Sequence, residues 1–300
     1  MDIFLQQIVN GLTIGSLYAL VALGYTMVYG VMKLINFAHG DLVALSAFAG
    51  LTIYTSIFAD GGTSIVAVIT VFMFTAAIIA VVGVLLERLA YRPLRTAPRL
   101  SAVVSALGAG LVIQNAIMLI WGPNMKIFPS DLFPSTVFDI NGVVITFTQL
   151  MILIFSSVLM VALYLFINKT KMGTAIRAVA IDQDAAKLMG INVNKIIMII
   201  FIIGSALGAV AGLFIGIYYR GITFDMGWMY GLSAFVAAII GGIGNIPGAM
   251  FGGLMLGLFN ALISGYISSA WAETFTFMLL IVVLIFRPTG ILGEKVAEKV

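Results

Sequence analysis

The stretch "INFAHGD", from Ile35 to Asp41, holds the only histidine of the sequence, and an aspartate follows it two positions later. Three interpretations are open for Asn36, His39 and Asp41. They form a helix-entry cluster, in which Asp41 complements the helix dipole and Asn36 accepts from exposed backbone N–H groups. Alternatively, they form a translocation path or gate with a switchable His39–Asp41 hydrogen bond, or a direct substrate site.

The remaining residues offer little catalytic chemistry. The absence of cysteine excludes disulfides, thiolate metal ligands and thiol nucleophiles, and a single histidine makes no metal cluster. Neither a G-x-S-x-G motif nor a G-x-x-x-x-G-K-[ST] phosphate loop is present. We therefore expect no enzyme, no bound cofactor or metal and no nucleic-acid partner, and any ATP-driven step requires another subunit.

Composition indicates a membrane protein, because 62% of the residues are hydrophobic and only 9% are charged. A span needs about 20 apolar residues. Charge-free runs of suitable length lie at 8–32, 42–59, 63–86, 101–121, 146–167, 196–219 and 248–267, and shorter or interrupted runs lie at 228–243 and 267–286. The predicted fold is an all-α polytopic membrane helical bundle of about eight spans, with broken or re-entrant helices.

Two short loops rich in Lys and Arg, at 87–100 and at about 168–195, predict which ends of the spans face the cytoplasm. Counting back places the amino terminus outside. The segment with His39 then lies on the cytoplasmic side, between the first and second spans. Glu87 is expected to pair with the adjacent Arg88.

A sequence repeat links the two ends of the chain. "FAHGDLVALSAF" from Phe37 and "FDMGWMYGLSAF" from Phe224 share F-x-x-G-x-x-x-x-L-S-A-F. An odd number of spans separates them, so they form a possible inverted repeat, which is a common plan of transporters. We predict one permease domain over 1–300, with repeat halves at about 8–121 and 196–286.

Glycines mark close packing and a possible break. Gly204, Gly208, Gly212 and Gly216 recur every four residues, which suits close approach of helices within the bundle or with a partner subunit. The segment "GGIGNIPGAMFGG" from Gly241 to Gly253 is either a helix break at membrane depth or a plain turn.

The second basic loop, 168–195, is long enough for short helices along the membrane. Ile176, Val179 and Ala180 share one helical face, Gly190 is placed to end a helix, and Asn192 or Asn194 to begin the next span.

"DAAKLMGI", from Asp184 to Ile191, resembles the loop by which permeases of ABC importers dock into their ATPases. Together with "ERLAYRPLR", "IGGIGNIPGA" and "RPTGILG", the chain is similar to LivH-type permeases of branched-chain amino acid ABC importers from about Asn10 to Gly293. The resemblance implies an ATPase-coupling set of Asp184, Ala185, Ala186, Gly190, Ile191 and Arg177.

The resemblance also implies the other subunits of the importer. The chain would sit in the bacterial cytoplasmic (inner) membrane with a second permease chain of LivM type, two ABC ATPase subunits that use the ATP, and an extracytoplasmic amino-acid-binding protein. The substrates would be leucine, isoleucine and valine. Alternatives are a related ABC permease for urea or short amides, an ion-coupled secondary carrier, and a structural scaffold.

Overall fold

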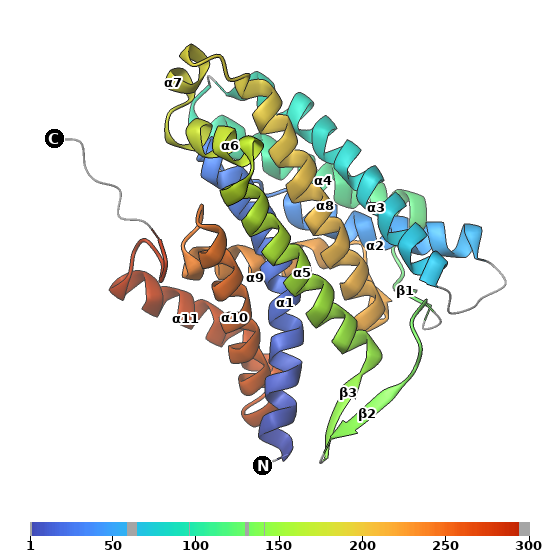
Figure 1. Ribbon diagram of the computed structural model, residues 1–300. Helices are drawn as coiled ribbons and strands as arrows, with labels where there is room; N and C mark the ends of the chain where they lie inside the picture. The colour runs from blue at the N-terminus through green and yellow to red at the C-terminus, as the bar shows by residue number, and fades with distance from the viewer. Residues whose placement is uncertain (1, 59–64, 96, 130–131, 141, 294–300) are drawn as a thin grey trace.

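A computed structural model describes residues 2–58, 65–95, 97–129, 132–140 and 142–293 of the chain. The elements in chain order (Figure 1) are α1 Asp2–Met32, α2 His39–Ile57, α3 Ile65–Leu86, η1 Glu87–Tyr91, η2 Arg92–Leu94, α4 Arg99–Trp121, β1 Lys126–Ile127, β2 Val137–Ile140, β3 Val143–Thr146, α5 Phe147–Lys169, α6 Lys171–Ile181, α7 Gln183–Leu188, α8 Val193–Tyr219, β4 Gly221–Ile222, α9 Met226–Gly241, α10 Ile246–Tyr266, η4 Ser269–Trp271 and α11 Ala272–Phe286.

Eight of the described helices are long and apolar enough to cross a membrane, and α9 is a shorter apolar helix. Helices satisfy every backbone hydrogen bond internally, which lipid requires of a spanning segment. Among the described residues, the strands form an antiparallel β2–β3 hairpin and a two-residue β1–β4 pairing. The predicted polytopic helical bundle is confirmed.

Local sequence explains where several helices begin. Thr146 and Gln149 form a capping box at the start of α5, so that two otherwise unpaired backbone N–H groups are satisfied. The side chain of Asn192 caps α8 and that of Asn245 caps α10. The prediction of an asparagine cap before the 196–219 span is confirmed at Asn192.

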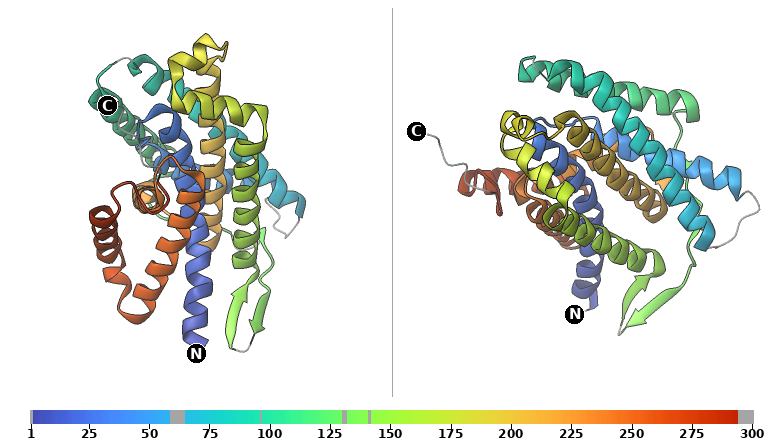
Figure 2. Two further views of the ribbon diagram at one scale, coloured as in Figure 1. Left: turned by 60° about the vertical axis from the view of Figure 1, so that its left-hand side comes forward. Right: turned by 45° about the horizontal axis from the view of Figure 1, so that its top comes forward.

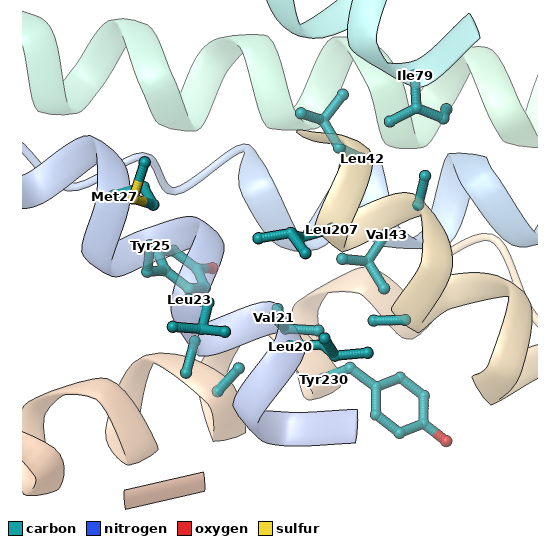
Figure 3. Close-up of a cluster of buried hydrophobic side chains, with 14 of the residues drawn as sticks. Leu20, Val21, Leu23, Tyr25, Met27, Leu42, Val43, Ile79, Leu207 and Tyr230 are labelled. Atoms are coloured by element: carbon teal, nitrogen blue, oxygen red, sulfur yellow. The ribbon is translucent and has the colours of Figure 1, made fainter. Parts of the chain in front are cut away.

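The core surrounds α1, which packs against α8, α9 and α10. Figure 3 shows Leu20, Val21 and Leu23 of α1 close to Val43 of α2 and Leu207 of α8, and all of them are buried. By contrast, many apolar side chains of α3, α4 and α11 are exposed on the outside of the bundle. In a membrane, lipid covers such outer surfaces.

The helices pack in the pairs that an inverted repeat would produce. The α1–α8 and α2–α9 contacts pair the equivalent helices of the two halves, and α3 packs on α8 as α10 packs on α1. At the α2–α9 contact, the equivalent glycines Gly40 and Gly227 each lie against the carbonyl oxygen of the other. A two-fold relation between the halves would produce this reciprocity. The boundaries of the halves stay a prediction.

The segment Gly241–Gly253, interpreted as a possible break at membrane depth, is a turn followed by α10. Gly242 and Gly244 have φ of +108° and +97°, and the turn lies beside Gly30, near the end of α1. Helices α2 and α9 instead begin in the interior of the bundle, where His39, Gly40, Met226 and Gly227 are buried. Glycine spacing alone does not distinguish a turn from a break.

The bundle has two different ends. Helices α6 and α7 project at one end, and the β2–β3 hairpin lies at the other, as Figures 1 and 2 show in different orientations. The predicted sidedness assigns the first end to the cytoplasm.

Candidate functional site: a central helix junction and a cytoplasmic handle

His39 opens α2 inside the bundle, not at its cytoplasmic end. Its side chain is 1% exposed and lies against Gly24 of α1 and Gly208 of α8. Gly24 is eight residues before the end of α1, a distance of about 12 Å along the axis. The expectation of a cytoplasmic location is therefore wrong, because the segment between α1 and α2 folds back into the bundle.

The imidazole of His39 has few polar neighbours. One hydrogen bond joins it to the backbone of Val21, and the ring of Tyr25 meets it edge-on at 4.9 Å between centroids. Within the part of the chain that the structure describes, its Nε2 atom has no hydrogen-bond partner. A buried polar atom left unpaired is costly and needs a physical explanation.

Asn36 does not cap α2. Its Oδ1 atom accepts a hydrogen bond of 2.9 Å from the hydroxyl of Tyr91, and α2 begins without a side-chain cap. The proposed acceptance from helix N–H groups is wrong, because tertiary packing brings a better donor from η1. The contact joins the entrance of α2 to the end of α3.

Asp41 lies in the first turn of α2, as the helix-entry interpretation expected. One carboxylate oxygen lies against Gly110 of α4 and the other against Gly227 of α9. Asp41 thus has different neighbours from His39, and three helices meet around its carboxylate. We refer to the meeting of the α2 and α9 amino termini, at Gly40 and Gly227, as the central junction.

Two residues of the central junction were missed by sequence reasoning. The Tyr25 hydroxyl reaches the backbone of Gly40, and Asp225 is the N-cap residue of α9, directly before the junction. The repeat gave no signal for Asp225, because it aligns Asp225 with Ala38 and Asp41 with Trp228. The Asp41 carboxylate therefore lies at the junction, whereas Asp225 is exposed and its side chain does not cap α9.

The glycine stripe of α8 faces other parts of the same chain. Gly204 lies against Gly24, Gly208 against His39 and Gly212 against the backbone of Val43. Further along, Gly216 lies against Phe128. The stripe lets α1 and α2 approach α8 closely and seats the His39 ring.

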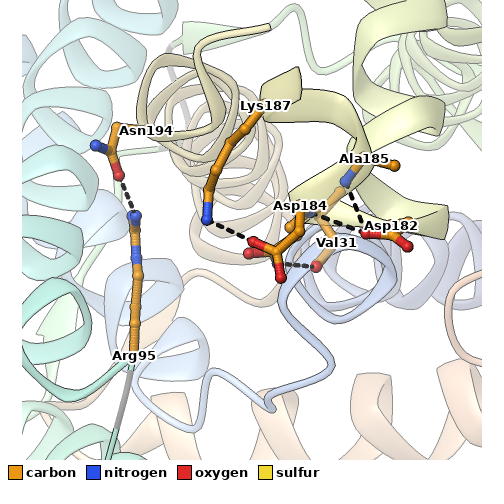
Figure 4. A network of polar contacts seen from close by, with 8 residues as sticks. Val31, Arg95, Asp182, Asp184, Ala185, Lys187 and Asn194 are labelled. Carbon is orange, nitrogen blue, oxygen red and sulfur yellow. Dashed lines mark hydrogen bonds and ion pairs between the residues drawn. The ribbon is translucent and has the colours of Figure 1, made fainter. Parts of the chain in front are cut away.

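Helices α6 and α7 form what we call the handle, residues 171–190. Ile176 and Val179 are buried, so α6 lies with the predicted face against the bundle. In Figure 4, the Asp182 carboxylate accepts from the backbone N–H of Asp184 and Ala185, which begins α7. The Gln183 amide donates to the Val31 carbonyl at 3.0 Å and ties the handle to the end of α1.

Gly190 ends α7 as predicted. Its φ is +81°, and the N–H groups of Gly190 and Ile191 donate to the carbonyls of Lys187 and Ala186. This pair of hydrogen bonds is a Schellman motif, in which glycine takes the left-handed conformation without a steric penalty.

The handle exposes large apolar side chains, although it lies outside the membrane-spanning helices and lipid does not cover it. Ile181, Leu188 and Met189 are 86%, 89% and 82% exposed. Asp184 and Ala185 are exposed beside them, whereas Ala186 is buried. Large apolar side chains with this exposure are common on protein-binding surfaces.

Arg177 points away from that face. Its guanidinium donates to the Ile167 carbonyl at 2.6 Å and to the Asn168 side chain at 3.3 Å. A cation at a helix carboxyl terminus is favourable, so Arg177 fixes the angle between α5 and α6.

Glu87 pairs with Arg95 rather than with the adjacent Arg88. Glu87 is 2% exposed, and Arg95 also donates to the Asn194 side chain at 2.6 Å, across to α8. Burial lowers the pKa of Arg95, and the Glu87 carboxylate opposes that shift. Adjacent helical residues point in different directions, which is why the Glu87–Arg88 prediction is wrong.

Residues 7–284 match a family model described as the permease component of branched-chain amino acid transport systems. The chain belongs to this family. The permease is 44% identical over 302 residues to the high-affinity branched-chain amino acid transport system permease protein BraD of Pseudomonas aeruginosa, covering 99% of this chain and 98% of that protein. It is 42% identical to LivH of Salmonella typhimurium, with the same coverage, and 29% identical to a probable LivH of Methanocaldococcus jannaschii, with 97% and 94% coverage.

The permease is thus a transport component and an integral protein of the inner membrane, in agreement with its eight membrane-capable helices. The family resemblance inferred from "DAAKLMGI" and "RPTGILG" is confirmed.

Proposed function

We propose that the permease is the membrane-spanning subunit of an ATP-driven importer of leucine, isoleucine and valine. Separate ATPase subunits grip the handle, and a second permease chain of LivM type completes the pathway. An extracytoplasmic binding protein delivers the substrate, and no cofactor binds to this chain.

The exposed apolar face of the handle is the observation that supports this proposal. Leu188 and Met189 occupy the loop predicted to face the cytoplasm, next to Asp184 and Ala185. The Asp182 cap, the Gln183–Val31 bond and the Arg177 contacts with the end of α5 make the handle continuous with the bundle. Movement of the handle is therefore transmitted to α1 and α5.

The central junction supports an amino acid as the substrate. Helix amino termini favour a carboxylate, and the half-helices of transporters use them in this way. The Asp41 carboxylate, which lies against Gly227 of α9 and Gly110 of α4, suits the substrate ammonium group. His39 lies against Gly208 and Asn36 accepts from the Tyr91 hydroxyl. These contacts at the entrance of α2 support the assignment of both residues to a gate.

Substitution of Gly190 tests the docking role. Valine strongly resists the left-handed conformation and asparagine tolerates it, while the space beside Gly190 is open to either side chain. We expect Gly190→Val to shift α7 out of its docking conformation at a cost of about 1–2 kcal/mol, which corresponds to about tenfold less ATPase retained on purification and reduced uptake.

Gly190→Asn is the matched control and should keep most of both activities. Membrane insertion should be equal for both variants. Normal ATP-dependent uptake by Gly190→Val would contradict the docking role.

The alternative within the same architecture is a permease for urea or short amides. If it held, these compounds would inhibit the uptake of labelled leucine. An ion-coupled carrier would instead transport in vesicles that contain the permease alone, driven by a proton or sodium gradient. We expect neither result.

A further inference from the structure

A basic cavity of about 240 Å³ lies between the η1–η2 segment and the amino terminus of α8, apart from the handle face and the central junction. Three cations, Arg88, Arg92 and Lys195, line it together with Glu87, Asn192, Asn194 and Met198.

The charge of this cavity is positive. The Glu87 carboxylate is engaged by Arg95, so it is already neutralised. The two ion pairs found among the described residues, Glu87–Arg95 and Asp184–Lys187, leave the three cations of the cavity without a carboxylate partner. The Arg88 guanidinium donates to the Met198 sulfur at 3.9 Å. Its other N–H groups are available to bind an anion. The amino terminus of α8 adds its dipole to the same place.

A lipid-facing surface leads directly to the cavity. Ile78, Val81, Leu85 and Leu89 are 45%, 60%, 48% and 76% exposed and follow one another at helical spacing along α3 and η1. Arg88 and Arg92 continue this line beyond the end of α3. An acyl chain lying along the line places its headgroup phosphate among the three cations.

We propose that this cavity binds the phosphate group of an anionic phospholipid, with the acyl chains along the exposed face of α3. Basic pockets between spans at the cytoplasmic surface recognise such headgroups through their phosphate oxygens, and arginine binds these in a bidentate manner. The proposal does not depend on the proposed transport function.

The test uses the purified full-length chain in a neutral detergent, with phosphatidylglycerol and phosphatidylcholine supplied in equal amounts and retained lipid counted by native mass spectrometry. Wild type should prefer phosphatidylglycerol. Each cation near a membrane surface contributes about fivefold, so Arg88→Gln with Arg92→Gln should retain about 25-fold less of it and unchanged phosphatidylcholine.

Lys169→Gln with Lys171→Gln removes the same charge from the same predicted side, outside the cavity, and should behave as wild type. Arg88→Lys with Arg92→Lys should keep most of the preference. Equal unfolding temperatures in neutral detergent establish that the variants are folded.

Equal retention of both lipids by wild type, or an equal loss in the Lys169 and Lys171 control, would overturn the proposal. Displacement of phosphatidylglycerol by millimolar inorganic phosphate would assign the cavity to free anions instead. The Arg88→Gln with Arg92→Gln variant could instead lose ATPase retention in a neutral bilayer and keep its lipid retention. That result would show that the cavity contacts a protein and would overturn the proposal.

Discussion

At the residue scale, glycine determines how closely other groups approach α8. The same residue type recurs four times in the stripe, but the neighbours differ. A methyl group on Gly212 would overlap the Val43 carbonyl and the Ser46 hydroxyl, whereas one on Gly204 would be in ordinary contact with Gly24 at 3.4 Å. The cost of adding that group should therefore differ along one stripe.

We expect Gly212→Ala to destabilise the permease by about 1–3 kcal/mol, as overpacking usually does, and Gly204→Ala to be close to neutral. Gly208→Ala, whose new methyl group meets the His39 ring at 3.0 Å, should fall between them. Unfolding temperatures in detergent measure the order. A Gly204→Ala variant less stable than Gly212→Ala would contradict the packing described for the stripe.

At the element scale, the central junction depends on two short amino termini that meet backbone to backbone. The reciprocal contact between Gly40 and Gly227 leaves no room for a side chain on either residue. Helices α2 and α9 are therefore held at a separation that any larger residue would increase.

We expect Gly40→Ala and Gly227→Ala each to reduce uptake and to destabilise the bundle by about 1–3 kcal/mol, since each forces the same two helices apart. The double variant should cost less than the sum of the two, because both changes disturb one contact. Gly108→Ala in α4 is the control, since its added methyl group meets no atom within 4 Å. Full additivity in unfolding measurements would argue against the shared contact.

At the scale of the whole molecule, the handle and the β2–β3 hairpin lie at opposite ends of the bundle. The positive-inside rule places the handle in the cytoplasm. The sequence contains no cysteine, so a single introduced cysteine reports one position without background.

We expect Ser135→Cys, near the hairpin, to react with a membrane-impermeant maleimide in intact cells, and Lys171→Cys, in the handle, to react only after permeabilisation. Both residues are exposed, so access to the reagent depends on the side of the membrane. Labelling of Lys171→Cys in intact cells would reverse the orientation and remove the basis for ATPase docking.

Several features were determined by the sequence alone because they depend on composition or on neighbours within a few residues. Hydropathy predicts the spanning helices, and the Asn192 and Gly190 caps follow from local backbone chemistry. The burial of Ile176 and Val179 follows from helical periodicity.

Only the tertiary structure decided which distant groups meet. It places His39 beside Gly24 and Gly208, gives Asn36 the Tyr91 hydroxyl, and directs Glu87 to Arg95. Each of these contacts depends on the depth at which a chain segment folds back and on the rotation of a helix about its axis. Packing between helices fixes both quantities, and local sequence does not encode them.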